Sequence, residues 1–430
     1  MPLLADLRFA IVLLLLIAFF SITGTVIEQG QTLEFYRENY PLSPALFGFL
    51  TYKVILAWGL DRVYGTWWFL TLLILFGVSL ATCTFHRQIP LLKVARRWFF
   101  VNKPQSITKL PYVVTLSHVV FDDLYLKLKE RGYHLSQTDR QFYGSKGLVG
   151  RVGPIVVHGS MLIILAGAIL GSLGGFIAQE MVPEGESFKV KNITTAGFFS
   201  SALIPKDWQV KVNRFWIEYS EKGKIEQFYS DLSVVDEEGK ELDRETIYVN
   251  KPLKFRGVTF YQASWDISRI RFRFNQSPLL ELPLSPLEAE STGQKVWGTW
   301  LPTKPDLSTG VSLIVPDLQG TVLIFDPEGN LLHTTRVGSA VEVNGVNLKI
   351  EGLVGATGLQ IKADPGIPIV YAGFALLMAG VVMSYVSYSQ VWGLRDGDLL
   401  YFGGKTNRAQ VAFYAELNSI LSSLNESLVA

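Results

Sequence analysis

The sequence is poor in cysteine and in charge, and each shortage excludes a class of protein. Its 430 residues include one cysteine, Cys83, which excludes an internal disulfide and any CxxC redox or zinc centre. Only 18% of the residues are charged, whereas soluble domains carry about a quarter. Lys and Arg number 39 against 38 Asp and Glu, so the basic surplus of a nucleic-acid binder is missing. With 49% hydrophobic residues, the chain fits a membrane protein that also has a soluble part.

Four apolar stretches are long enough to cross a bilayer, which takes about 20 residues. They cover residues 9–26, 66–83, 153–177 and 366–388. The first could instead be a cleaved signal peptide, but Asp6 and Arg8 cancel in charge and no A-x-A site follows. We therefore expect four spans, and no transit peptide before the first, because the apolar run begins almost at once.

The connecting segments predict the orientation, because Lys and Arg accumulate on the cytoplasmic side. Segment 84–152 carries 12 basic and four acidic residues, a net charge of +8, whereas loop 27–65 has a net charge of −1. We expect residues 1–83 to form two spans with a short outer loop, and segment 84–152 to face the cytoplasm or stroma. After the third span (153–177), segment 178–365 would lie in the periplasm or thylakoid lumen. The fourth span (366–388) would return the tail 389–430 to the inner side.

Segment 178–365 has the pattern of a mainly β domain. Alternating or β-rich runs occur at 208–219, 269–274, 311–315, 321–325 and 341–350, with glycines between them. A β-sandwich or barrel-like domain is expected.

The inner segments predict a smaller α+β unit. Within 84–152 we expect strands at 112–118, 133–136 and 141–145 and a helix at 122–131, and the tail should end in an amphipathic helix at about 409–424. Gly403-Gly404-Lys405-Thr406 resembles the end of a phosphate loop, but position 399 is leucine where that motif needs glycine. Nucleotide binding is therefore not expected.

Two of the five histidines stand out by their depth. His158 lies about five residues inside the third span, roughly 8 Å below its start, and His86 follows the second span directly. An ionisable group in a span is costly and marks a candidate site, and neutral imidazole is a common axial ligand of haem iron. His158 could also make a hydrogen bond between helices, and His86 could be an interfacial side chain. We expect solvated roles for the other three histidines, His118, His134 and His333.

The remaining patterns indicate binding or assembly rather than self-contained catalysis. No nucleophile–base pair, metal-spaced cluster or glycine-rich cofactor loop is found in the sequence. Gly167 and Gly171 in the third span, and Gly373 and Gly380 in the fourth, would allow close helix packing, either within the chain or with a partner subunit.

Five stretches, taken together and in order, resemble the Ccs1/ResB family of type II cytochrome c maturation, in its cyanobacterial and plastid branch. They are SITGTVIEQ (21–29), GSKGLVGRVGPIVVHGSMLIILAGAILG (144–171), VNKPLKFRGVTFYQASW (249–265), LQIKADPGIPIVYAGFALLMAGVVMSY (359–385) and GGKTNRAQVAF (403–413).

This resemblance implies a multi-pass protein of the thylakoid membrane, or alternatively of a plasma membrane. It would act with a CcsA-type membrane partner to move haem across the membrane and present it to apocytochrome c, as part of a haem-attachment complex. Thiol-reducing proteins would supply the cysteines that the chain lacks. The family's histidine in the span before the large domain matches His158, and His86 corresponds to a histidine after the second span. Both are expected haem ligands.

Two alternatives remain. The chain could be a structural scaffold for the CcsA-type partner and the thiol pathway without touching haem, in which case histidine substitutions would be tolerated. A transporter of another ligand is disfavoured, because four spans without an inverted repeat or broken helices are atypical of transporters.

Overall fold

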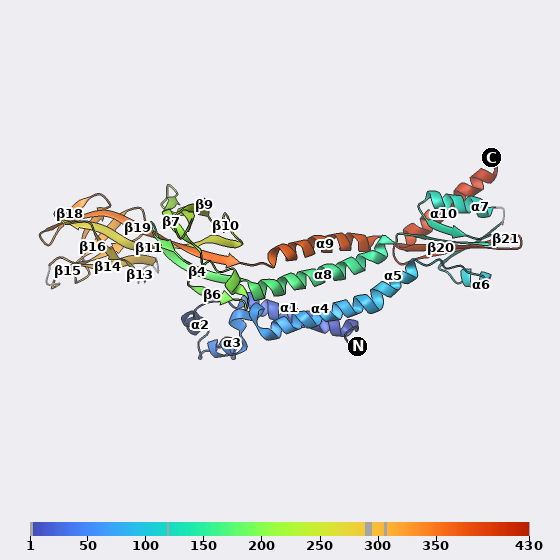
Figure 1. The fold of residues 1–430 in the computed structure, drawn as a ribbon, viewed down its shortest axis with the longest axis horizontal. Helices are drawn as coiled ribbons and strands as arrows, with labels where there is room; N and C mark the ends of the chain where they lie inside the picture. The colour runs from blue at the N-terminus through green and yellow to red at the C-terminus, as the bar shows by residue number, and fades with distance from the viewer. Residues whose placement is uncertain (1–2, 118–119, 289–294, 305–307, 430) are drawn as a thin grey trace. The chain divides into compact units, whose positions relative to one another are not determined.

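A computed structural model describes residues 3–117, 120–288, 295–304 and 308–429, so His118 lies outside the described part. The chain divides into two compact units. We call Met1–Gln29, Arg37–Leu170 and Gly366–Ala430 the membrane unit, and Gly30–Tyr36 with Gly171–Pro365 the β unit. Figure 1 shows their elements.

The membrane unit contains four helices that are long and apolar enough to cross a bilayer, which confirms the predicted spans. The helices are α1 (Leu7–Val26), α4 (Trp67–Cys83), α8 (Val149–Gly174) and α9 (Ile367–Tyr385). The second continues past the predicted end at Cys83, through a π-helical turn (Thr84–Gln88) into α5 (Ile89–Ala95). The loop after α1 forms the short helices α2 (Leu33–Asn39) and α3 (Tyr52–Trp58).

Glycines allow α8 and α9 to pack closely in antiparallel fashion. A Cβ atom placed on Gly380 would lie 2.9 Å from the backbone nitrogen of Val157, and one on Gly373 would lie 2.6 Å from Cγ1 of Ile164. On α8, a Cβ atom on Gly167 would lie 2.8 Å from Val370. These small residues therefore serve a contact within the chain, which is one of the two alternatives left open by the sequence.

The segments before α8 and after α9 form one five-stranded antiparallel sheet. Its order is β1 (Tyr112–Ser117), β21 (Leu399–Thr406), β20 (Ser389–Asp396), β3 (Gln141–Lys146) and β2 (His134–Gln137). Buried side chains of α7 (Phe121–Glu130) and α10 (Gln410–Val429) share one core with this sheet. Gly403 and Gly404 lie in β21, a strand, which agrees with the expected lack of a phosphate loop.

The described residues of the β unit form three sheets. The largest has the order β10 (Leu253–Phe255), β11 (Val258–Phe274), β19 (Val346–Ala363), β4 (Phe176–Pro183) and β6 (Ile193–Ala196). In addition, β12 (Leu280–Pro283) pairs with β11, and β18 (Ala340–Val343) pairs with β19. A second sheet runs β13 (Ser285–Glu288), β14 (Lys295–Pro302), β15 (Gly310–Val315), β16 (Thr321–Phe325) and β17 (Leu331–Arg336). The third runs β5 (Ser187–Phe188), β7 (Trp208–Tyr219), β8 (Ile225–Asp236) and β9 (Glu241–Tyr248).

Among its described residues the β unit has two large hydrophobic cores, and the long strands β11 and β19 contribute to both. Near one end of these strands, Phe260 and Ile361 pack with residues of β7 and β8. Near the other end, Ile270 and Ile350 pack with residues of β14, β15 and β16. The expected mainly β domain between the third and fourth spans is confirmed, but it contains two stacked cores rather than one sandwich.

We predict that Gly380→Leu destabilises the protein, because the added side chain would meet the backbone of Val157 on α8. Overpacking of this kind costs about 1–3 kcal/mol. Thermal unfolding of the detergent-purified chain should show a lower melting temperature. Val382→Leu is the matched control, because Val382 is 69% exposed on the same helix. Equal melting temperatures for the two variants would contradict the close contact between α8 and α9.

Candidate functional site

His158 lies in α8 and makes a hydrogen bond to the second span. Its Nδ1 atom is 2.9 Å from Oγ1 of Thr84, the first residue of the π-helical turn. The Thr84 hydroxyl also donates to the carbonyl oxygen of Leu80, at 2.8 Å. A span histidine and a span threonine therefore satisfy each other where water is scarce.

The hydrogen bonds of Thr84 favour one tautomer of a neutral His158. A threonine hydroxyl has a single proton, and in this geometry that proton is donated to the Leu80 carbonyl. The Thr84 oxygen then accepts from Nδ1–H of His158. In a neutral imidazole this leaves the lone pair on Nε2, which is the form that ligates metals.

The π-helical turn has an evident cause in the sequence. Pro90, at the start of α5, has no N–H group and cannot donate to the carbonyl oxygen four residues before it. The N–H of Ile89 instead reaches back five residues to the carbonyl oxygen of Thr84. Turns of this kind are rare and often occur at functional sites.

His86 is exposed in the same turn, two residues after Thr84. Residues two apart on a helix lie roughly half a turn from each other, so they do not share a face. Thr84 meets α8 and His86 points elsewhere. The structure thus pairs His158 with Thr84 and does not bring the two predicted histidines together.

Arg151 lies two turns before His158, roughly 10 Å along the same face of α8. Its guanidinium carbon is 5.1 Å from the ring centroid of Tyr388, whose hydroxyl donates to the carbonyl oxygen of Ala95 at 2.8 Å. The Nε atom of Arg151 is buried without a hydrogen-bond partner in the described part of the chain. A buried cationic donor with spare capacity is suited to a carboxylate.

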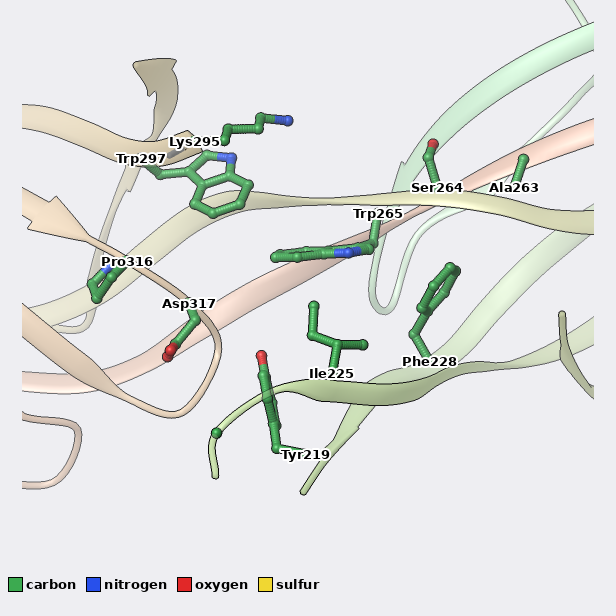
Figure 2. Close-up of a pocket in the computed structure, with 11 residues that line it drawn as sticks. Tyr219, Ile225, Phe228, Ala263, Ser264, Trp265, Lys295, Trp297, Pro316 and Asp317 are labelled. Atoms are coloured by element: carbon green, nitrogen blue, oxygen red, sulfur yellow. The ribbon is translucent and has the colours of Figure 1, made fainter. Parts of the chain in front are cut away.

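The β unit has an open cavity of about 450 Å³ between β7, β8, β11 and β14. Figure 2 shows Tyr219, Ile225 and Phe228 extending towards Trp265. The rings of Trp265 and Trp297 lie 5.1 Å apart, and Lys295 stands over the Trp297 ring at 5.0 Å. Such a lining is typical of sites that hold an apolar or aromatic group.

The polar groups around this cavity have hydrogen-bond donors to spare. Burial raises the pKa of Tyr219, so its hydroxyl stays protonated, and its oxygen already accepts from the N–H of Leu318 at 3.3 Å. The carboxylate of Asp266 accepts from Trp297 Nε1 and lies 3.6 Å from Lys295 Nζ. The spare donors on Tyr219 and Lys295 suit carbonyl or carboxylate oxygens of a ligand.

A buried polar cluster determines where Trp265 stands. Ser230, Gln262 and Thr357 join β8, β11 and β19 through hydrogen bonds of 2.5–2.8 Å. The register of β11 shifts between Gln262 and Ser264, and Nε2 of Gln262 donates to the carbonyl oxygen of Ser264 at 3.0 Å. The cluster therefore stabilises the bulge directly before Trp265.

Sequence reasoning missed Thr84, Arg151 as a site residue, and the cavity. The Thr84 side chain could have been suspected from Pro90, because a proline six residues later marks a disturbed helix. No local sequence pattern predicts the cavity, because its lining residues come from segments that are far apart in the chain.

Comparison with known proteins gives the chain's family. The model of the ResB-like family matches residues 7–344 and 312–418. A cytochrome c biogenesis protein CcsB from Microcystis aeruginosa is 59% identical over 420 residues, covering 98% of this chain and 94% of the relative. Proteins of the same name from Thermosynechococcus vestitus and from a Nostoc species are each 58% identical. The former covers 99% of this chain and 95% of the relative, and the latter 99% and 92%.

The similarity therefore extends over both units, from the first span to the strands and helix that follow the last. The chain belongs to the ResB-like family.

Proposed function

We propose that this protein acts in cytochrome c biogenesis by ligating haem through Nε2 of His158 while haem crosses the membrane. The relatives are named as cytochrome c biogenesis proteins, which supports the process. The observation that carries the residue assignment is the hydrogen bond between Nδ1 of His158 and Thr84. It orients the ring and leaves the lone pair of a neutral imidazole on Nε2, as the outer hydrogen bond of a metal-ligating histidine commonly does.

Haem is here the substrate, and two features of α8 fit its chemistry. The iron needs an imidazole nitrogen with a lone pair, and the contact with Thr84 favours Nε2 of His158 for this role. The propionates need a cationic donor, and Arg151 lies on the same face with its Nε atom unpartnered in the described part of the chain. The separation of two helical turns, roughly 10 Å, is compatible with one porphyrin that reaches both residues.

A CcsA-type partner would complete the haem site. His86 faces away from the contact between His158 and Thr84, so we propose that a haem ligated by His158 would not be held by His86 as well. We further propose that thiol-reducing proteins act beside this complex, since Cys83 is the chain's one cysteine.

The proposed orientation places the five-stranded sheet in the stroma or cytoplasm and the β unit in the thylakoid lumen. The contacts of the membrane unit support it, because Oγ of Ser79 in α4 donates to the carbonyl oxygen of Leu4 at 2.8 Å. The N-terminus therefore lies at the end of the bundle where α4 leads into the basic segment 84–152. That segment has a net charge of +8, and the positive-inside rule applies.

The scaffold alternative loses part of its support. A scaffold would use the Gly167/Gly171 surface or the tail helix for partner assembly, yet Gly167 packs on α9 of the same chain and Gly171 on Asp364. Substitutions at these glycines would disturb the fold of the chain before they disturbed a complex. His158 distinguishes the haem-ligating function from the scaffold function, because a scaffold would not need this histidine.

The cavity of the β unit is the proposed contact for apocytochrome c. An unfolded polypeptide presents aromatic side chains and free carbonyl oxygens, which match the rings of Trp265 and Trp297 and the donors of Tyr219 and Lys295. This contact would hold the acceptor protein on the side where haem is delivered.

We predict that His158→Ala lowers the haem content of the complex purified with its partner by more than about tenfold, because an axial ligand is lost. A pyridine haemochrome assay measures haem per mole of chain, and the yield of c-type cytochromes should fall with it.

The matched control is His86→Ala, which removes an exposed imidazole from the adjacent span. It should keep most of the haem. Unchanged haem content and cytochrome yield in His158→Ala would contradict haem ligation by His158 and favour the scaffold function.

We predict that Trp265→Ala weakens binding of a labelled apocytochrome c polypeptide to the purified full chain by about 10–30-fold, the usual effect of removing a central aromatic side chain. Fluorescence anisotropy measures the dissociation constant. Trp300→Ala is the control, because Trp300 is 47% exposed on β14 and does not line the cavity. Equal losses in both variants would disprove a specific role of the cavity.

A further inference from the structure

Two adjacent phenylalanines of the β unit face outward after β6. Phe198 is 84% exposed and Phe199 is 61% exposed. Their rings contact each other edge to face, with centroids 4.9 Å apart. A single exposed apolar residue needs no explanation, but a preassembled pair of large aromatic rings is costly to leave in water.

The backbone around this pair is fixed to the end of the third span. The N–H of Phe199 donates to the carbonyl oxygen of Leu173 at 2.8 Å, and the N–H of Gly197 donates to that of Gly175 at 2.9 Å. A Cβ atom on Gly197 would lie only 2.3 Å from the carbonyl oxygen of Leu173, so glycine is needed for this approach. The loop 197–199 therefore lies directly against the last turn of α8.

That last turn lies at the boundary of the hydrocarbon layer. From Gly153 to Gly174, α8 is free of charged side chains and spans roughly 33 Å, which matches a hydrocarbon thickness of about 30 Å. The surface of α8 leading to this end is itself open to lipid, since Leu170 is 48% exposed. The phenylalanine pair is thus held by backbone hydrogen bonds to Leu173 and Gly175, at the level where this apolar helix ends.

We propose that Phe198 and Phe199 insert into the outer leaflet as a membrane anchor of the β unit. The occupant of this surface is the acyl-chain region of lipid. The pair would fix the β6 end of the large sheet at the bilayer surface, in addition to the covalent connections through α8 and α9. This inference does not depend on the proposed haem function.

The test uses the full chain in phosphatidylcholine vesicles with a nitroxide label at position 198. Cys83→Ala removes the single native cysteine, and Phe198→Cys then provides the attachment site. Power-saturation EPR compares access of membrane-soluble oxygen with access of a water-soluble nickel chelate. We expect oxygen access to exceed nickel access at position 198, and also at position 199 in the Phe199→Cys variant.

Leu331→Cys is the matched control, because Leu331 is 54% exposed on β17 in the other part of the β unit. Its label should favour the nickel chelate. If the label at 198 behaved like the label at 331, the pair would be in water and the proposal would be wrong. Protection from both reagents would show a protein contact and would equally overturn it.

Discussion

The hydrogen bond between His158 and Thr84 is the interaction on which the functional account depends. Inside a bilayer a polar side chain needs an internal partner, and here each of the two residues provides one for the other. The second bond of Thr84, to the carbonyl of Leu80, favours donation from Nδ1–H of His158 to the threonine oxygen. The π-helical turn at Pro90 occurs where this threonine meets α8. The π-helical turn thus begins at the threonine that makes the hydrogen bond to His158.

A second constraint is that α8 and the strands at its two ends each pair with α9 or with a strand next to α9. Strand β3 leads into α8, and α8 leads into β4, while β19 leads into α9 and α9 leads into β20. Each element pairs with its counterpart: Lys146 of β3 with Ser389 of β20, and Phe176 of β4 with Ala363 of β19. Between them, glycines bring α8 and α9 together. The span that carries His158 is therefore held by antiparallel pairing at both of its ends.

The elements that could be predicted from the sequence are those with a simple period. The four spans and the strand 208–219 follow from length, composition and alternation, and β7 has the predicted bounds. Strands β20 and β21 were missed because they do not alternate: Val391, Trp392, Gly393 and Leu394 are all buried in succession. This sheet is covered on both faces, so its apolar run resembles the end of a span.

For the site, the sequence indicated His158 by its depth, but it could not indicate its partner. Thr84 is 74 residues away, and the role of a threonine depends on which helix it faces. His86 was a weaker candidate in the sequence because it follows the second span, and the structure adds that it is exposed and lies half a turn from Thr84. The cavity around Trp265 arises from long-range strand pairing and a bulge, which local patterns do not encode.

The most direct test of the central claim is chemical rescue of a variant that lacks the His158 side chain. In His158→Gly, the ring is deleted while the lipid-facing surface of α8 is kept, and free imidazole can enter the space. The account predicts that added imidazole restores the haem absorption spectrum of the purified complex in His158→Gly. A folded His158→Gly complex that binds haem without imidazole, or that imidazole cannot restore, would contradict ligation of haem by this residue.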